Sequence, residues 1–575
     1  MNTNTSHSKE HMESILNSSR WAVYGDVIGF ISELANESLL KRRINSSRVS
    51  EPTEWKRLIG GRYGASVFLP KGCYSDDTQL RLATSRSIRG DGDFDVEVFA
   101  KVELPVWLSY ALGAGRGSKA AAASLSRQST NWFSNFFEQK NTNYFQAGGN
   151  GAAMRIQPHV WSSTSRLNSE TYLLDVIRNS ICTHGHPRGF LGAVFHAYCL
   201  ASTIETNEIA NIDVWERAID VFLDVPDIIN GDSELSAFWR PVWEDRTGRS
   251  LKSSIMKVRD ECLADIDSTL KYTDINSEGN YHRLVSSLGG LRDDQRGSGT
   301  KTAILASALA WMYRNDNPEV ALQASANLLN SDTDTIGTMA GAILGAGISN
   351  KPRIRVEDQD YIDSEALRLY QISCGKQVSS FQYPNLYNWS PPKAQLDALG
   401  MVGDKLCLAG IGYGTTVSEL YASRSSPNIM WQWVKLDFGQ TVLVKRREEL
   451  KQLVKGNAAQ NIKDNRNSEA QSFLSGKKVM NESIKKPTYQ KEMLNRNERI
   501  DSNRSQKIDA NMSINQLTTE AIKSGFDEAL IGYHILWLTG QENGIEKVIA
   551  YSAIIAKAKI SRDQFPSKAK NNISK

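Results

Sequence analysis

Two short clusters of oxygen-bearing side chains are the residues in this sequence best suited to chemistry. The first is Ser75-Asp76-Asp77-Thr78 and the second is Asp332-Thr333-Asp334-Thr335. Each cluster directly precedes an apolar segment with helical spacing. Each is therefore expected at a helix N-terminus, where Ser, Thr and Asp accept hydrogen bonds from free backbone N–H groups. A capping role would explain either cluster taken singly.

The number of carboxylates argues for more than capping. A cap uses one side-chain acceptor, and a helix dipole offsets only about half a charge, so each cluster leaves surplus negative charge. If the two clusters meet in space, a divalent cation is the simplest way to neutralise them. Carboxylate and hydroxyl oxygens favour Mg²⁺, Mn²⁺ or Ca²⁺ over Zn²⁺ or Cu²⁺. More than 250 residues separate the clusters, and the sequence alone does not show that they meet.

Three further segments contain residues of the kind that bind ligands. Gly25-Asp26-Val27-Ile28-Gly29 leads to Glu33, and residues 148–155 (GGNGAAMR) form a Gly/Ala segment of the type whose backbone N–H groups can approach a phosphate. Thr183-His184-Gly185-His186-Pro187 places two histidines before a helix-like run. A tight turn would also explain the glycines. Either histidine could cap a helix, pack in the core or contact a ligand.

These five segments, in their order along the chain, resemble the ADP-ribosylglycohydrolase family. That family includes the dinitrogenase-reductase-activating glycohydrolases and the ADP-ribosyl-acceptor hydrolases. The segments are GDVIGFISE, YSDDTQL, GNGAAMRIQP, THGHP and SDTDTIGTMAGAILGA, and the resemblance covers about residues 20–350. It implies an all-α fold with a binuclear Mg²⁺ or Mn²⁺ centre at the bottom of a cleft.

The resemblance also implies roles for individual residues. The implied metal ligands are Ser75, Asp76, Asp77, Asp332, Asp334 and Thr335. The implied substrate-binding residues are Asn150, Gly151, Met154 and His184. Glu33 matches a family acidic residue close to the ribose, and Glu33 and Asp76 are the candidate catalytic residues. The chain departs from the family where Ser75 replaces a frequent Thr and where Asn330-Ser331 replaces a frequent Gly-Gly.

The implied reaction is hydrolysis of the N- or O-glycosyl bond between C1″ of ADP-ribose and its acceptor. Its transition state resembles an oxocarbenium ion, and two divalent cations would orient the ribose and lower the pKa of a bound water. A carboxylate beside a cation is a poor acid, which favours Glu33 over Asp76 as the general acid. Whether Glu33 acts in acid–base chemistry or positions the ribose stays open.

The acceptor and two other functions also stay open. The acceptor could be arginine or serine on an ADP-ribosylated protein, a base of an ADP-ribosylated nucleic acid, or a small molecule. One alternative is a catalytically silent module that binds ADP-ribose or blocks a partner. Another is a structural or assembly protein with an empty site.

The composition limits the class of protein and the cellular compartment that can be expected. Of 575 residues, 40% are hydrophobic and 23% are charged, which excludes a chain disordered throughout and a fibrous chain. Six cysteines form no CxxC pair, which favours a reducing compartment and predicts a cytoplasmic location. No run of apolar residues is long enough to span a membrane, so no membrane partner is expected. Residues 1–20 contain no apolar run, so no secretory signal is expected there.

Charge and pattern predict several parts along the chain. Residues 441–575 contain 24 Lys and Arg against 15 Asp and Glu, and the rest is slightly acidic. This basic region is either a solvated tail or a contact for an acidic partner; reversal of a toxin's modification is a hypothesis that rests on it and on the additional C-terminal parts. The parts expected are a polar leader (1–20), a compact helical catalytic body (21–352), a small β-containing extension (376–445), a disordered linker (446–512) and a helical hairpin (513–561).

Two local patterns make sharper structural predictions. Gly337, Gly341 and Gly345 recur every four residues in an apolar helical segment. Since each glycine costs a helix roughly 1 kcal/mol, we expect close backbone packing at a buried central helix. WQWVKL and TVLVKRR flank residues 437–440 and predict a β-hairpin. Its aromatic residues are either the core of a small subdomain or a surface on which nucleic-acid bases stack.

Overall fold

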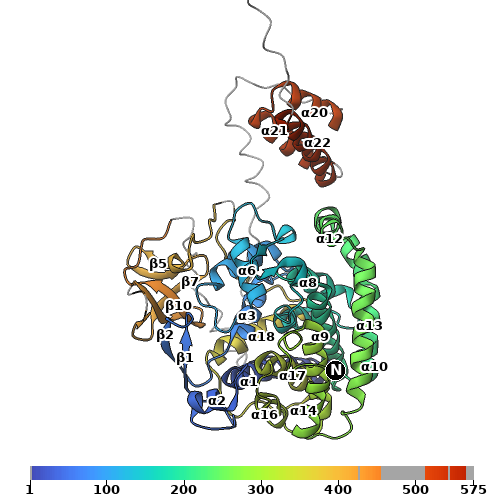
Figure 1. Cartoon of the computed structure of the whole chain (residues 1–575). Coiled ribbons are helices and arrows are strands. Elements are labelled where there is room, and N and C mark those ends of the chain that lie inside the picture. Colours follow the sequence, from blue (N-terminus) through green and yellow to red (C-terminus); the bar gives the residue numbers. More distant parts are fainter. Residues whose placement is uncertain are drawn as a thin grey trace, which may run out of the picture. The chain divides into compact units, whose positions relative to one another are not determined.

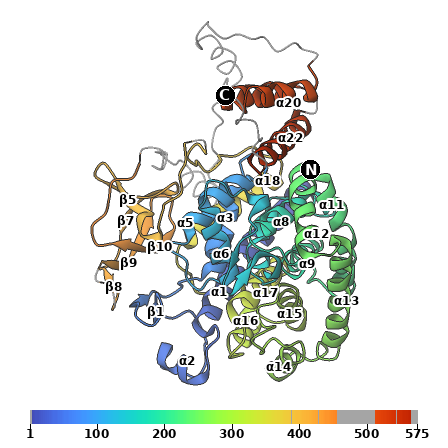
Figure 2. The same ribbon diagram turned by 45° about the horizontal axis from the view of Figure 1, so that its top comes forward.

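The structure is a computed structural model that describes residues 3–386, 388–424, 426, 428–454, 512–541 and 544–564. The chain falls into two compact units, Met1–Val479 and Met480–Lys575. The first unit is mostly helical, as predicted, with small antiparallel sheets beside the helices (Figure 1). In both views the largest sheet and helix α13 lie at opposite edges of the helical body (Figure 2).

The α-helices described in the first unit alternate with short 3-10 and π turns. They are α1 (Thr3–Ser32), α2 (Glu37–Ile44), α3 (Asp76–Ser87), α4 (Val96–Val98), α5 (Leu104–Trp107), α6 (Arg116–Leu125), α7 (Gln157–Ser162), α8 (Glu170–Ile181), α9 (Pro187–Thr206), α10 (Ile212–Asp220), α11 (Val225–Gly231), α12 (Arg240–Thr247), α13 (Leu251–Leu270), α14 (Glu278–Ser287), α15 (Gly299–Met312), α16 (Pro318–Ala326), α17 (Thr333–Gly347) and α18 (Gln359–Ser373).

The contact between α1 and α17 forms the centre of the first unit. Glycines let the two backbones touch: a Cβ at Gly25 would lie 2.1 Å from the carbonyl oxygen of Gly337, and a Cβ at Gly341 would lie 2.2 Å from that of Trp21. Serine hydroxyls of α1 also donate to carbonyl oxygens of α17. The close packing predicted from the glycine spacing is confirmed, and it offsets the helix propensity that the glycines lose.

Helices extend the body at both ends of the predicted range 21–352. Helix α1 begins at Thr3, so most of the expected polar leader is helical, and Ile15 is buried. Its polar residues bond to the glycine-rich helix, as when the Ser14 hydroxyl donates to Ala346 O at 2.7 Å. At the other end α18 packs on α1, and Arg20 pairs with Asp363 at 2.8 Å. Polar composition therefore concealed a buried helical face.

Strands form three antiparallel sheets in the described part of the first unit. Strand β1 (Trp55–Ile59) pairs with β2 (Ala65–Leu69), and β3 (Glu138–Gln139) pairs with β4 (Thr142–Asn143). The third sheet has the order β10-β9-β7-β6-β5, with β8 also on β9. Its strands are β5 (Leu399–Val402), β6 (Lys405–Leu408), β7 (Gly412–Thr416), β8 (Tyr421–Ala422), β9 (Ile429–Leu436) and β10 (Thr441–Arg447). Strands β9 and β10 confirm the predicted hairpin, with Lys435 opposite Thr441.

A buried ion pair and buried hydrogen bonds connect the third sheet to the helices. Arg86 of α3 pairs with Glu103 at 2.7 Å and donates to Gln440, next to β10, also at 2.7 Å. Asp358, next to α18, accepts from the backbone N–H of Thr441 at 2.6 Å. Unpaired, these buried charges would be costly, so the sheet and the body are energetically coupled.

The aromatic residues of the hairpin are core residues. Trp431 and Trp433 are buried, and the Trp433 indole N–H donates to the carbonyl oxygen of Phe68 in β2 at 3.1 Å. A Cβ at Gly60, in the β1–β2 turn, would lie 2.6 Å from the Trp431 ring. Of the two predicted roles for these residues, the structure supports packing, and the partner is the β1–β2 hairpin.

The second unit contains three described helices where a helical hairpin was expected. They are α20 (Ile514–Lys523), α21 (Glu528–Thr539) and α22 (Gly544–Gln564), and they share a small core around Leu517 and Tyr551. Gly525 and Phe526 have φ angles of 78° and 66°, which ends α20 and separates it from α21. Most of the expected linker, residues 455–511, lies outside the described residues. None of the described helices has the length and apolar content of a membrane span.

Candidate active site

The first predicted cluster forms the N-terminus of α3, as expected. Ser75 is the N-cap: its hydroxyl accepts from the backbone N–H of Asp77 and lies within hydrogen-bond distance of Asp77 Oδ2, each at 3.2 Å. Asp76 Oδ1 accepts from the backbone N–H of Ala114 at 2.7 Å. The serine hydroxyl therefore caps the helix, and neither carboxylate is needed for that role.

A further carboxylate, Asp26 of α1, supports the start of α3. It is fully buried and accepts from the backbone N–H groups of Ser75 and Thr78, each at 3.0 Å. Arg81 donates to Thr78 Oγ1 at 2.7 Å and to Thr338 Oγ1 of α17 at 2.6 Å. Asp26 had no predicted role. The available signal was its place between two glycines, which mark the contact with α17.

The second cluster forms the N-terminus of α17 and meets the first. Asp332 is the N-cap, but its side chain makes no capping bond, and its Oδ2 accepts instead from Asn150 Nδ2 at 2.8 Å. Thr335 Oγ1 lies 3.5 Å from Asp77 Oδ2, so residues 258 positions apart are in contact. We use the name acidic centre for Ser75, Asp76, Asp77, Asp332, Asp334 and Thr335.

Burial and mutual repulsion raise the pKa of the carboxyl groups in the acidic centre. The pKa values of Asp77 and Asp334 lie well above the ordinary value, first because of burial and then because of neighbouring carboxylates. Burial and then the charge of Glu33 raise the pKa of Asp76 to about 8, and the same causes raise the pKa of Asp332. To stay ionised near neutral pH, these groups need a counter-charge.

The chemistry of the acidic centre fits a divalent cation. Asp77 Oδ1 is buried without a hydrogen-bond partner in the described structure, so this carboxylate oxygen is available to a ligand. The donors are carboxylate and hydroxyl oxygens, which suit Mg²⁺ or Mn²⁺. No three His, Cys, Asp or Glu side chains among the described residues could hold a metal ion as they are arranged. Hydroxyl groups or water would therefore have to complete the coordination.

The glycine-rich segment lies beside the acidic centre. The Asn150 backbone N–H donates to Gly297 O, and the Gly299 N–H donates to Gly148 O, each at 3.0 Å, which anchors the segment to the start of α15. Because the Asn150 side chain also holds Asp332, the loop and the start of α17 are joined directly. We refer to residues 148–154 as the glycine loop.

His184 packs against the glycine loop. A Cβ at Gly151 would lie 3.1 Å from His184 Cε1, and Met154 is buried. Burial, and then the charge of Arg155, lower the pKa of His184 to about 3, so its imidazole is neutral. The structure thus brings together the predicted substrate-binding residues, and Asn150 connects them with the predicted metal ligands.

Arg155, which had no predicted role, holds the glycine loop and the His184 segment together. Its buried guanidinium donates to Gly151 O and to Thr183 Oγ1, each at 2.8 Å, and also to Asn179. The signal in the sequence was a charged residue inside the apolar segment GAAMRIQP. A buried charge of this kind is expected to have several partners.

Glu33 lies just beyond α1. After burial, its charge is the next cause of the raised pKa values of Asp76, Asp332 and Asp334. Its Oε2 accepts from Arg57 Nη2 of β1 at 3.1 Å. The Arg57 guanidinium lies 4.5 Å from the centroid of the Phe30 ring, and its Nη1 is buried without a hydrogen-bond partner in the described structure. The strand that carries Arg57 was not predicted, so this ion pair could not be found from the sequence.

Comparison with known proteins confirms the family resemblance. Residues 22–374 match the ADP-ribosylglycohydrolase family, a range that includes α18. A search of curated proteins returned no match. Among solved structures, one titled "ADP-ribosylglycohydrolase-related protein complex" is similar with a TM-score of 0.39 and 17% identity, covering 64% of this chain and 99% of that chain.

Proposed function

The chain belongs to the ADP-ribosylglycohydrolase family, and from that premise we propose that it hydrolyses the glycosyl bond between C1″ of ADP-ribose and an acceptor with the help of two divalent cations, Mg²⁺ or Mn²⁺. Membership of the family supports the general activity, that of a hydrolase that acts on ADP-ribosylated substrates. The metal-dependent part rests on one observation: Thr335 Oγ1 lies 3.5 Å from Asp77 Oδ2, so two acid-rich helix starts converge.

The six residues of the acidic centre are the proposed cation ligands. Bound there, divalent cations would supply the positive charge that orients ribose hydroxyls and lowers the pKa of a bound water. Two features support this role over simple helix capping. Asp77 Oδ1 has no hydrogen-bond partner in the described structure, and the Asp332 side chain does not cap its own helix.

The glycine loop and His184 are the proposed substrate-binding elements, through Asn150, Gly151 and Met154. Without a side chain at Gly151, a phosphate could approach the loop backbone closely. His184 Nε2 faces this loop, since it lies 3.7 Å from a Cβ placed at Gly149. A neutral imidazole in that position can donate a hydrogen bond to a phosphate oxygen.

Glu33 and Asp76 are the proposed catalytic residues. The Arg57 guanidinium donates to Glu33 Oε2 at 3.1 Å. A carboxylate that accepts a hydrogen bond from a guanidinium suits a proton acceptor, or a partner for ribose hydroxyls, better than the proton donor favoured from the sequence. We therefore propose that Glu33 takes a proton from the attacking water or holds the ribose, with Asp76 as the second candidate.

A panel of acceptors tests the proposal. Full-length protein is incubated with ADP-ribosyl-arginine, ADP-ribosyl-serine and ADP-ribosylated DNA, with Mg²⁺, Mn²⁺ or a chelator, and released ADP-ribose is measured. Metal-dependent release from at least one acceptor supports the proposal. No release, with ADP-ribose still bound, would favour the silent binding module. An Asp334→Ala variant whose thermal shift with metal is unchanged would favour a structural protein.

A truncated protein tests whether the C-terminal parts affect the choice of acceptor, and the position of the truncation matters. A cut near residue 352 would remove α18 and the third sheet, which are bonded into the body. A cut after residue 454 keeps both, and equal acceptor selectivity would then exclude the second unit from substrate choice. Contact of the basic region 441–575 with an acidic partner, and reversal of a toxin's modification, are further proposals.

The cellular location is also a proposal. All six cysteines are described and are free thiols, which supports a reducing compartment such as the cytoplasm.

A further inference from the structure

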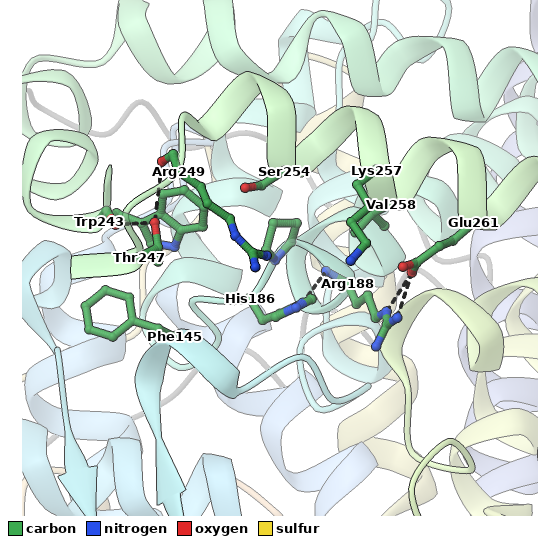
Figure 3. A pocket seen from close by; sticks show the side chains of 11 residues that line it. Phe145, His186, Arg188, Trp243, Thr247, Arg249, Ser254, Lys257, Val258 and Glu261 are labelled. Carbon is green, nitrogen blue, oxygen red and sulfur yellow. Dashed lines mark hydrogen bonds and ion pairs between the residues drawn. The ribbon is translucent and has the colours of Figure 1, made fainter. Parts of the chain in front are cut away.

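A cavity of about 240 Å³ lies between the start of α9 and the segment that joins α12 to α13 (Figure 3). None of its lining residues belongs to the acidic centre. Most polar residues of its wall come from two places, the start of α9 and the region of α13: His186, Arg188, Arg249, Ser254, Lys257 and Glu261. Thr247 of α12 is the other polar residue. We refer to it as the cationic cavity.

Positive charge exceeds negative charge in this cavity. Arg188 pairs with Glu261 at 2.8 Å, whereas Arg249 and Lys257 are exposed and have no ion pair in the described structure. Their charged groups point toward His186 (Figure 3). Burial, and then the charges of Arg188, Lys257 and Arg249, lower the pKa of that histidine to about 4, and the contribution of these charges agrees with this placement. Three cations and one carboxylate leave a net charge of +2.

Two uncharged donors add to the cations. His186 Nδ1 accepts from the backbone N–H of Arg188 at 3.2 Å, so in the neutral ring the proton lies on Nε2, which can donate. Ser254 Oγ is buried and has no hydrogen-bond partner in the described structure. An unpartnered buried hydroxyl is costly, and rotation of the Ser254 side chain toward an anion oxygen in the cavity would satisfy it.

The rest of the wall is apolar apart from Thr247, whose hydroxyl already donates to Trp243 O at 2.8 Å. Trp243 is buried and its indole N–H is already bonded to Gly185 O at 2.7 Å, so its ring contributes apolar surface. Phe145 and Val258 also line the cavity. The volume exceeds that of a phosphate ion, so a small organic body such as a sugar ring can enter with the anionic group.

We propose that the cationic cavity binds the phosphate monoester of a small organic molecule. A phosphate monoester carries a charge of about −1.5 to −2 at pH 7 and three acceptor oxygens. It therefore matches both the net charge of the cavity and its free donors. A carboxylate, with one charge and two oxygens, matches less well.

The phosphate could come from two sources, and the distinction rests on the proposed function. Gly148, at one end of the glycine loop, packs on His186, with a Cβ there 3.0 Å from Nδ1, whereas Asn150 bonds to Asp332 of the acidic centre. A diphosphate on the loop, with its reactive ribose at the acidic centre, would direct the adenosine end toward the cavity. The monoester is then either an additional phosphate on that adenosine or part of a separate small molecule.

Calorimetric titration of the full-length protein, in chelator and at low salt, tests the site. The probes are ribose 5-phosphate and acetate, and the variants are the double variant Arg249→Ala/Lys257→Ala and the control Lys252→Ala, an exposed lysine of α13 outside the cavity. Ribose 5-phosphate should bind the wild type, about tenfold or more weaker to the double variant, and within twofold of wild type to the control. Equal binding to the double variant, or equal binding of acetate, would overturn the proposal.

Two further experiments are needed. The first distinguishes the two sources of the phosphate monoester, and the second distinguishes failure of the cavity proposal from failure of the proposed function. Tighter binding of 2′-phosphorylated ADP-ribose than of ADP-ribose, lost in the double variant, identifies the substrate as the source. Equal binding of these two ligands, with ribose 5-phosphate still lost in the double variant, identifies a separate molecule. Asp77→Asn should leave ribose 5-phosphate binding intact even if hydrolysis fails. Loss of binding in Asp77→Asn would place the phosphate at the acidic centre and refute the cavity.

Discussion

The acidic centre and the cationic cavity contact the glycine loop at different residues, Asn150 and Gly148, and are built in opposite ways. The acidic centre consists of side chains from two helix starts far apart in the sequence, all of them buried except the partly buried Asp332. The cavity takes most of its charge from exposed side chains around α13. Buried like charges are costly without compensation, whereas exposed cations cost little because water screens them. The first region therefore depends on core packing, and the second can change without endangering the fold.

Removing one buried carboxylate should have the largest effect. Asp77→Asn should lower metal-dependent hydrolysis by more than about a hundredfold, because a cation contributes several kcal/mol to charge stabilisation. In chelator, the same variant should unfold at an equal or higher temperature, since one repelling charge is gone. Activity and differential scanning calorimetry check both. A clear loss of stability in chelator would show that Asp77 serves only the fold.

Displacing the start of α17 should also break the acidic centre, without changing a carboxylate. In Gly29→Ala the new Cβ would lie 2.4 Å from Thr333 O and 2.5 Å from Asp334 Cα. Overpacking of this kind costs about 1–3 kcal/mol or more, so the melting temperature and the Mn²⁺ affinity should both fall.

Gly279→Ala is the matched control for that variant, because a Cβ there meets nothing within 4 Å. It should leave metal affinity unchanged and gain up to about 1 kcal/mol of helix propensity. If Gly29→Ala behaved like this control, the backbone contact between α1 and α17 would not position the acidic centre.

Cutting the connection at the glycine loop should have an intermediate effect. Asn150→Ala removes the bond to Asp332 and should weaken Mn²⁺ binding by about 10- to 100-fold, as supporting residues of metal sites typically do. Titration with Mn²⁺ measures it. Asn211→Ala, which removes the cap of α10, should cost about 1 kcal/mol of stability with no change in metal affinity. Equal Mn²⁺ affinities in Asn150→Ala and Asn211→Ala would show that the bond between Asn150 and Asp332 does not support metal binding at the acidic centre.

The smallest effect is expected at the partly exposed ion pair beside the acidic centre. Arg57→Ala should lower kcat/KM by about two- to tenfold, because such a pair contributes about 1 kcal/mol or less. Arg57→Lys should restore part of the loss, since it keeps the charge near Glu33. Arg62→Ala, in the same hairpin, is the control and should match the wild type in steady-state kinetics. Equal kcat/KM values for Arg57→Ala and Arg62→Ala would show that Arg57 does not contribute to the reaction.

Local patterns were read correctly where neighbours in the chain decide the structure. The glycines at every fourth position predicted close backbone packing at a buried helix, although not that α1 is its partner, and the residues around 437–440 predicted the β9–β10 hairpin. The prediction was wrong where local composition misleads. The C-terminal hairpin is three helices because Gly525 and Phe526 end α20.

The sequence by itself determined the chemistry available to the site: which residues carry oxygen donors, and that each donor cluster begins a helix. Only the tertiary structure decided that the two clusters touch, and that Asp26, Arg57 and Arg155 support them. The physical reason is range. Helix capping involves groups a few residues apart, so it leaves a mark in the sequence. The contact between Asp77 and Thr335 depends on how α1, α3 and α17 pack, and that packing is the sum of many weak contacts that no short pattern records.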